Sequence, residues 1–282
     1  MRGAAGALVA AGLVATGCSG GAAPSAGTPT ATVSALPAVP GIEAEAVRLR
    51  TDEAVGGQLQ VRVTDTGTTP FTVTAVAIDS PGFAPLPAEP VSATFDPGRT
   101  IDLPTPFGPA RCAAGPEPAA ARLTVVRADG AVAELRVPLT GGTLTQLHAE
   151  ECALAAVREV VGIALADLAP APGGTRLTGA VVLSRRAGGE PIAVTALARS
   201  VLLDAVPDEE LPATLGPDAD RLRLPVTFEP ATCEPHVLAE AKKPFVFPLT
   251  VVVGGSDGVA VDLPVDGGQR ALLQDLVDRV CG

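Results

Sequence analysis

Residues 123–142 read LTVVRADGAVAELRVPLTGG, and residues 249–268 read LTVVVGGSDGVAVDLPVDGG. Both segments open with Leu-Thr-Val-Val, turn at a stretch that contains Gly and Asp, continue as a second apolar run and close on Gly-Gly. Apolar or alternating runs on either side of such a turn are typical of two neighbouring β-strands. The recurrence of this pattern predicts that the chain repeats one β structure.

Two more segments recur upstream of this repeat, and both pairs have the same offset along the chain. They are PFTVTAV and PIAVTAL, which begin at Pro70 and Pro191, and FGPARC and FEPATC, which begin at Phe107 and Phe228. Each copy also ends in a short amphipathic segment that carries a cysteine, Cys152 in the first and Cys281 in the second. Three co-linear matches with a shared cysteine pair indicate an internal duplication.

Strand-length apolar runs separated by Gly, Pro and Asp fill both copies and predict an all-β fold. The spacing of their turns is similar to that of immunoglobulin-like β-sandwiches. This resemblance implies two tandem immunoglobulin-like β-sandwich domains, residues 42–158 and 159–282, each ending in a short helix. Pro138 and Pro264 lie at matching places within strand-like runs and predict strand ends or edges, because proline cannot donate to a ladder. At the boundary, the alignment of the copies favours a strand from about Val161 onward.

The terminal segment of each copy predicts a helix, because its apolar residues fall on one face at a period of 3.6. The expected apolar faces are Leu144, Leu147 and Ala155 in the first copy and Leu272, Leu273, Leu276, Val277 and Val280 in the second.

The N-terminus has Arg2, a short apolar run from Gly3 to Ala15, and then Thr16-Gly17-Cys18. The run is shorter than the ~20 residues of a membrane span but suits the core of a signal peptide. Its end resembles a bacterial lipobox, at which a signal peptide is cut before a cysteine that carries a diacylglycerol thioether. The resemblance implies that residues 1–17 are a lipoprotein signal peptide and that Cys18 is the lipidation site.

Residues 18–41 are rich in Gly, Ala, Pro and Thr and predict a flexible tether. Two or three acyl chains anchor a protein stably, at about 0.8 kcal/mol per buried methylene. We therefore expect an exported protein that is lipid-anchored at the extracytoplasmic face of the cell membrane. The alternatives are a secreted protein cut at another site and an uncleaved N-terminal anchor.

The other four cysteines form one pair per copy, Cys112 with Cys152 and Cys233 with Cys281. In the oxidising compartment that receives exported chains, an even number of cysteines at repeated positions indicates disulfides. Four cysteines allow three pairings, and the duplication selects the pairing within each copy. Each disulfide would stabilise the fold by roughly 4 kcal/mol in the chain-entropy model.

A metal site is the alternative for these residues. His148 precedes Cys152 by one helical turn, and His236 follows Cys233 as Cys-x-x-His, so four soft ligands have spacings suited to zinc or copper. However, the ligands come from different copies, and neither histidine has a counterpart in the other copy. We therefore expect surface histidines, no metal and no other cofactor.

Composition and motifs disfavour several classes of function. The formal net charge of −11 disfavours nucleic acid as a partner, because an acidic surface repels phosphates. Trp and Tyr are absent, which makes carbohydrate binding by ring stacking unlikely. No nucleophile elbow, P-loop or dinucleotide fingerprint emerges, and GGSDG at residues 254–258 predicts a turn between strands. We therefore expect a protein that is not an enzyme.

Residues 204–220, DAVPDEELPATLGPDAD, carry six acidic side chains and no basic one. Their prolines predict a stiff, solvated connection, and their spacing matches no calcium-binding loop. The corresponding segment of the first copy, residues 80–90, is Pro-rich but almost uncharged. A long loop that differs between copies is the best candidate interaction surface. Its acidic residues are Asp204, Asp208, Glu209, Glu210, Asp218 and Asp220.

The leading functional hypothesis is a lipid-anchored cell-envelope protein that acts as a non-catalytic protein-interaction or scaffold module. Its expected partners are the membrane, through Cys18, and another envelope protein. The alternative is an extracytoplasmic carrier that holds a lipid or other apolar small ligand in an aliphatic cleft. An apolar pocket open to solvent would favour the carrier, and tightly filled sandwiches would favour the scaffold. A buried polar constellation around His148 or His236 would revive an enzyme.

Overall fold

The computed structural model describes residues 36–282, and this part of the chain is predominantly β, with fifteen strands and four helices. The predicted signal peptide, Cys18 and most of the predicted tether lie outside the described residues. None of the helices within residues 36–282 is both long enough and apolar enough to cross a membrane.

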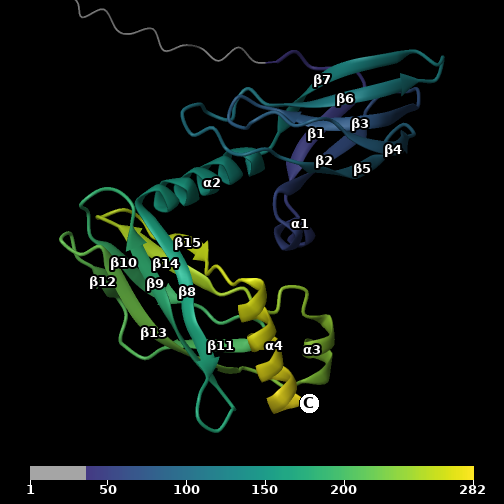
Figure 1. Cartoon of the computed structure of the whole chain (residues 1–282). Helices are drawn as coiled ribbons and strands as arrows, with labels where there is room; N and C mark the ends of the chain where they lie inside the picture. Colours follow the sequence, from purple (N-terminus) through teal and green to yellow (C-terminus); the bar gives the residue numbers. More distant parts are fainter. Residues whose placement is uncertain (1–35) are drawn as a thin grey trace, which may run out of the picture. The chain divides into compact units, whose positions relative to one another are not determined.

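The first seven strands form one sheet in the order β4-β3-β6-β7-β1-β2-β5 (Figure 1). Their bounds are β1 Ile42–Val47, β2 Gln58–Asp65, β3 Phe71–Asp79, β4 Glu89–Phe95, β5 Thr100–Pro106, β6 Ala120–Arg127 and β7 Val132–Thr140. Neighbouring strands are antiparallel, except that β1 runs parallel to β7 with Ala44 opposite Leu139.

Alternation of apolar and polar residues explains which face of these strands is buried, because successive side chains of a strand point to opposite faces. In β2, Val61 and Val63 are fully buried, whereas Arg62 between them forms a two-point ion pair with Asp102 of β5 at 2.7 and 2.9 Å. The hydrogen bond and the charge of Asp102 raise the pKa of Arg62. Val61 belongs to the same apolar cluster as Phe71 of β3, so the seven strands fold around one core.

The second half contains two four-stranded sheets, in the orders β12-β10-β14-β15 and β11-β13-β9-β8. Their bounds are β8 Val161–Pro170, β9 Leu177–Arg185, β10 Ile192–Leu197, β11 Leu203–Pro207, β12 Ala213–Leu215, β13 Arg221–Pro230, β14 Pro248–Val253 and β15 Val259–Asp262. All pairs are antiparallel. Val181 of β9 and Val194 of β10 belong to one apolar cluster, so the two sheets enclose a common core.

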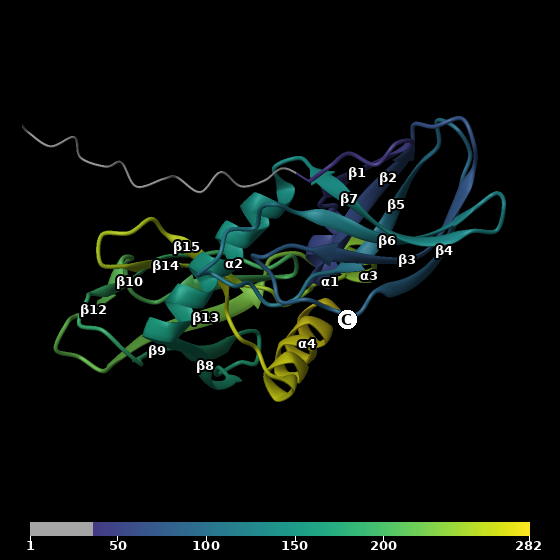
Figure 2. The same cartoon turned by 90° about the horizontal axis from the view of Figure 1, so that it is seen from above.

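Four helices accompany the strands: α1 Arg50–Val55, α2 Thr143–Val160, α3 Pro235–Glu240 and α4 Gly267–Cys281. Helix α2 contributes Leu144 and Leu147 to the first core and Val157 to the second. Helix α4 packs beside β8, where the Gln269 side-chain amide donates to the Leu165 carbonyl at 2.8 Å (Figures 1 and 2).

The predicted terminal helices are confirmed, but their apolar faces differ in part from the prediction. Leu144 and Leu147 are buried as expected, whereas Ala155 is only half-buried and Val157 takes its place. In α4, Leu273, Leu276 and Val277 are buried, Leu272 is half-buried and Val280 is exposed. The buried stripe of α4 is therefore narrower than the sequence pattern predicts, and that of α2 is shifted toward Val157.

Strand β8 begins at Val161, as the alignment of the two copies predicts. Pro138 lies opposite Ala120, where the β6–β7 ladder ends, and Pro264 follows the end of β15, so both prolines lie at ends of strand pairing. The predicted domain boundary between residues 158 and 159 falls in the last turn of α2 and stays a prediction.

Both predicted cysteine pairs are disulfides in the structure. Cys112 is bonded to Cys152 of α2, and Cys233 is bonded to Cys281 of α4. In each half the bond therefore joins a loop that follows a long strand, β5 or β13, to the helix that ends the half.

Candidate functional site

The acidic segment 204–220 is not a loop throughout, which corrects the sequence-based expectation. Residues Leu203–Pro207 form β11 and Ala213–Leu215 form β12, which pair with β13 and β10 respectively. Pro207 is compatible with β11 because it is the last residue of an edge strand, a position that tolerates proline. The segment therefore crosses from one sheet to the other, and the connection between the two strands carries Asp208, Glu209 and Glu210.

The six carboxylates lie at the surface and form no ion pair within residues 36–282. Asp204 is half-buried and the other five are exposed. Asp208 accepts a hydrogen bond from the Thr227 hydroxyl at 3.0 Å. Asp204 lies opposite Glu229 in the β11–β13 ladder, and the Glu229 carboxylate is itself paired with Arg176 at 2.9 Å.

Arg185, at the end of β9, holds the C-terminal part of this segment in place. Its guanidinium donates to the carbonyls of Gly216 and Glu190 at 2.8 Å, of Ala219 at 3.1 Å and of Gly188 at 3.4 Å. Its backbone N–H donates to the Asp220 carbonyl at 2.8 Å. Because Arg185 binds carbonyls and no carboxylate, it fixes the backbone that carries Asp218 and Asp220 without forming an ion pair with either side chain.

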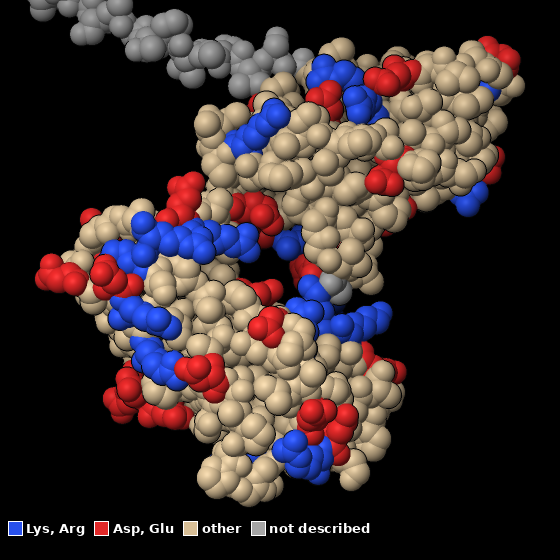
Figure 3. Space-filling view, in the orientation of Figure 1, with Lys and Arg blue, Asp and Glu red and all other residues tan. Residues whose placement is uncertain are grey.

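Figure 3 shows how charge is distributed over one face of the molecule. Acidic and basic side chains are interspersed there, and much of the surface between them carries no charge. On the side where Figure 1 places β12 and β13, acidic side chains lie among basic ones. This is the side of the second half to which the strands of segment 204–220 belong.

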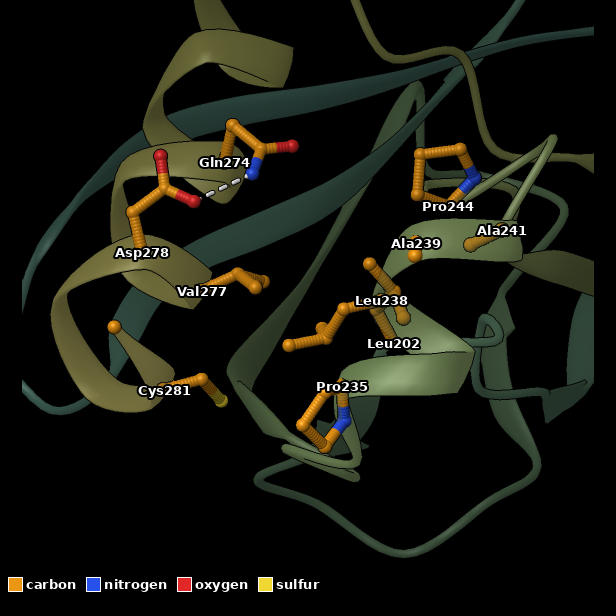
Figure 4. Close-up of a pocket in the computed structure, with 11 residues that line it drawn as sticks. Leu202, Pro235, Leu238, Ala239, Ala241, Pro244, Gln274, Val277, Asp278 and Cys281 are labelled. Carbon is orange, nitrogen blue, oxygen red and sulfur yellow. Dashed lines mark hydrogen bonds between the residues drawn. The ribbon is translucent and has the colours of Figure 1, made fainter.

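A second candidate site is an open groove of about 460 Å³ between α3 and α4 (Figure 4). Leu202 and Leu238 line it opposite Val277 of α4, and Ala241 and Pro244 extend the apolar wall. Its volume is in the range of small-molecule pockets, which is roughly 300–1,000 Å³.

Only one side chain that lines this groove carries a charge. It belongs to Asp278, whose carboxylate accepts from the Gln274 side-chain amide at 2.7 Å. The other walls consist of aliphatic side chains, prolines and the sulfur of Cys281. The groove thus combines an apolar wall with the polar side chains of Gln274 and Asp278. Sequence reasoning missed it because α3, a six-residue helix with Pro235 at its start, has no repeating apolar pattern.

The histidines and cysteines do not form the metal site considered as an alternative. Cys152 and Cys233 are bonded to other cysteines, so neither offers a thiolate. His236 is exposed, and its Nε2 lies 3.4 Å from Oε2 of Glu240. Within residues 36–282, no three His, Cys, Asp or Glu side chains lie together as potential metal ligands.

Residues 254–258 spell Gly-x-Ser-x-Gly, but they form the turn between β14 and β15, as predicted. The Ser256 hydroxyl donates to the Asp257 carbonyl at 3.2 Å. A nucleophile elbow instead connects a strand to a helix and presents its serine at the turn. This serine therefore lacks the local geometry of that motif.

No protein-family model and no curated protein matches the chain. Among solved structures, a protein of unknown function from Porphyromonas gingivalis W83 aligns at 15% identity and a TM-score of 0.21, over 78% of this chain and 94% of that one. Red sea bream transglutaminase aligns at 8% identity and a TM-score of 0.23, over 81% of this chain and 32% of that one. Overlaps with TM-scores this low carry no argument about fold or activity.

Proposed function

We propose that the protein is a lipid-anchored cell-envelope protein and a non-catalytic interaction module, built from two immunoglobulin-like sandwiches that arose by duplication. Lipidation at Cys18, followed by the tether of residues 18–41, would hold the module at the extracytoplasmic face of the membrane. The following observations support each part of the proposal.

Matching topology supports the duplication. In the first half, β3 lies between β4 and β6, and in the second half β10 lies between β12 and β14. The β3 ladders shift register between Val73 and Ala75, and the β10–β14 ladder shifts between Val194 and Ala196. These irregularities fall at the same place in the repeated PFTVTAV and PIAVTAL segments. A shared bulge is a specific feature, because a bulge re-aims the strand that carries it.

The pairing of β1 supports an immunoglobulin-like arrangement of the first half. This strand pairs antiparallel with β2 and parallel with β7, so it connects the strands β2 and β5 to the strands β7, β6, β3 and β4. In the second half, the same chain order gives separate sheets, with β8 at the edge beside β9. The two halves thus share a strand order and differ in the pairing of their first strands: β1 pairs with strands on both sides, whereas β8 pairs with β9 alone.

The observation that carries the functional proposal is the acidic segment 204–220, whose carboxylates form no ion pair among the described residues and whose C-terminal part is held by Arg185. An ordered surface with several carboxylates that form no ion pair among the described residues is complementary to a basic protein surface, and such complementarity steers encounter and fixes register. Both cores are meanwhile filled with fully buried side chains such as Leu123 and Phe228. Filled sandwich interiors leave the surfaces as the place for recognition.

The test uses carbodiimide cross-linking in the native envelope, because this reagent joins carboxylates directly to lysines of a bound partner. We expect a stoichiometric protein partner cross-linked within residues 204–220. The double substitution Glu209→Lys and Glu210→Lys should abolish this cross-link. The matched control is Glu89→Lys with Glu134→Lys, two exposed carboxylates of the first half that form no hydrogen bond or ion pair among the described residues. Equal recovery from both double variants would refute the acidic surface as the binding site.

The groove between α3 and α4 favours a carrier of an apolar ligand as the second candidate function. Native mass spectrometry of gently purified protein tests it, because a bound lipid would add a discrete mass. Leu238→Glu would place a charge in the apolar wall and should remove that mass, whereas Glu209→Lys with Glu210→Lys should not. If a ligand is bound in a Leu238-dependent way and no protein partner is found, the carrier function would be favoured over the interaction module.

A further inference from the structure

The two disulfides form a matched pair inside one chain, which allows their environments to be compared. In each, the loop cysteine is exposed, Cys112 and Cys233, and the helix cysteine is half-buried, Cys152 and Cys281. Their Cα–Cα distances are similar, 5.5 and 5.1 Å. The two bonds differ in the groups that contact their helix sulfur atoms.

His148 lies beside the sulfur of Cys152, one helical turn before it on α2. Its Nε2 is 3.7 Å from Cys152 Sγ and 3.3 Å from the carbonyl oxygen of Arg111. A carbonyl can only accept, so this contact places the proton of the imidazole on Nε2. The same N–H lies within reach of Cys152 Sγ, so it can be shared with that sulfur when the sulfur acquires negative charge.

Packing holds the His148 ring in this position. The ring meets Phe83 edge-on with centroids 5.5 Å apart, and a methyl group on Gly82 would lie 2.9 Å from the His148 ring. The Arg111 N–H donates to the Gly82 carbonyl at 2.7 Å and ties the loop before Cys112 to the same wall. The imidazole is therefore fixed against the disulfide by contacts on several sides.

Cys281 has the opposite kind of neighbour. Its Sγ lies 3.7 Å from the Thr232 carbonyl oxygen, which can accept from a thiol but has no proton to give a thiolate. The position four residues before Cys281 is Val277, which is buried in the second core. The helix that carries Cys281 thus has no donor at the place where α2 has His148.

We propose that Cys112–Cys152 is a site of thiol–disulfide exchange with a dithiol reductant, and that His148 promotes the exchange by stabilising the Cys152 thiolate. A thiolate of the reductant attacks the exposed Cys112 sulfur, the S–S bond breaks, and its electron pair leaves on Cys152 Sγ. The second thiol of the reductant then displaces Cys112 and closes the reductant's own disulfide. Two electrons pass from the dithiol to the protein, and both protein sulfurs end as thiols. A better-stabilised leaving thiolate speeds this exchange.

Reduction would free one connection of the first half and spare the second half. The loop that carries Cys112 is joined by this bond to the middle of α2, whose first turns pack in the first core. Opening of the bond would release the loop from that helix, whereas Cys233–Cys281 would continue to hold α4. This site is separate from the acidic segment, and its test is independent of the proposed interaction function.

The test is a time course with limiting dithiothreitol on the full chain carrying Cys18→Ser, which removes the remaining cysteine from the exchange. Free thiols are blocked with N-ethylmaleimide at each time, and peptide mass spectrometry quantifies both disulfides in the same sample. We expect Cys112–Cys152 to be reduced about tenfold faster than Cys233–Cys281, as suits a hydrogen bond to a charged group that is partly formed in the transition state.

Two substitutions separate the role of His148 from a general effect on folding. His148→Leu should bring the rate of Cys112–Cys152 to that of Cys233–Cys281, and His148→Gln, which keeps a neutral donor, should give an intermediate rate. The rate of Cys233–Cys281 and the melting temperature serve as internal controls. Rates within twofold of one another in the Cys18→Ser chain would overturn the proposal without any need for the His148 variants.

Discussion

Arg185 offers a prediction whose magnitude can be worked out from its contacts. Its guanidinium forms three hydrogen bonds to carbonyls at 2.8 to 3.1 Å and a longer one at 3.4 Å. Because the side chain is only half-buried, water can replace much of what Arg185→Ala removes. We therefore expect a loss of about 2 kcal/mol in the free energy of unfolding, below the sum of three separate charge-assisted bonds. Arg185→Lys should recover less than half, because an ammonium lacks the planar fork.

The assay is urea unfolding combined with amide hydrogen exchange, and the neighbouring Arg186 supplies the control. The Arg186 guanidinium forms one hydrogen bond, to the Arg158 carbonyl at 2.8 Å, and its residue is exposed. Arg186→Ala should therefore lower the free energy of unfolding by less than about 1 kcal/mol. Arg185→Ala should also speed exchange at Ala219, whose N–H donates to Gly216. Equal losses for the two variants would refute the role assigned to Arg185.

The same variant separates geometry from net charge in the proposed interaction. Arg185→Ala makes the region around Asp218 and Asp220 more negative, so attraction by charge alone predicts stronger cross-linking to a basic partner. If the partner instead needs these carboxylates on a fixed backbone, cross-linking should fall. The carbodiimide experiment distinguishes the two, and an increase would show that the ordered backbone does not matter.

Four further predictions concern anchoring and stability. Cys18→Ala should release the protein from membranes or leave an uncleaved precursor, as fractionation and intact mass would show, and unchanged acylation would exclude the lipoprotein assignment. Cys233→Ser with Cys281→Ser should lower the free energy of unfolding by up to roughly 4 kcal/mol, measured by denaturant titration against the oxidised chain. Phe228→Ala should cost about 3–5 kcal/mol in the same titration, because the ring is fully buried and meets Phe247 edge-on at 5.1 Å. Residues 161–282 expressed alone should unfold in one cooperative transition, and a non-cooperative transition would show that this half depends on the first.

Strands with regular alternation could be predicted from the sequence, and irregular ones could not. Strands β2, β3, β6 and β7 are confirmed because each has an apolar or alternating run of strand length, although the bulge between Val73 and Ala75 interrupts the alternation of β3. Strand β12 has three residues and β11 ends in proline, so neither carries enough of a period to be distinguished from a loop. Pairing with β10 and β13, which comes from tertiary context, decides both.

Helix α1 shows a second limit of sequence reasoning. Its six residues have no apolar periodicity, and its stability comes from Asp52, a buried carboxylate. Asp52 accepts from the backbone N–H of Leu49 at 2.8 Å and from the side-chain amides of Gln58 and Gln60. This hydrogen-bond network depends on where the fold places Gln58 and Gln60. It therefore cannot be predicted from a single Asp in a polar stretch of sequence.

The candidate sites follow the same division. The acidic character of segment 204–220 can be recognised from the sequence alone, because it contains six acidic residues and no basic one. The ordered backbone of this segment cannot be predicted from the sequence, because Arg185 contacts backbone carbonyls, which every residue possesses. Sequence reasoning also found both cysteine pairs but placed His148 on the surface. Its contact with Cys152 depends on the loop before Cys112, whose path the sequence pattern does not predict.

Under the proposed duplication, positions that differ between the copies are the most informative about function, because the shared scaffold makes them comparable. His148 corresponds to Val277, so one helix has an N–H donor where the other has an apolar side chain. Val277 packs in the core and lines the groove against α3, a helix with no counterpart in the first half. A histidine at that position would disturb both, because burial of a polar ring without a partner is unfavourable. The groove and the His148 contact are therefore alternative uses of one equivalent position, which explains why each half carries only one of them.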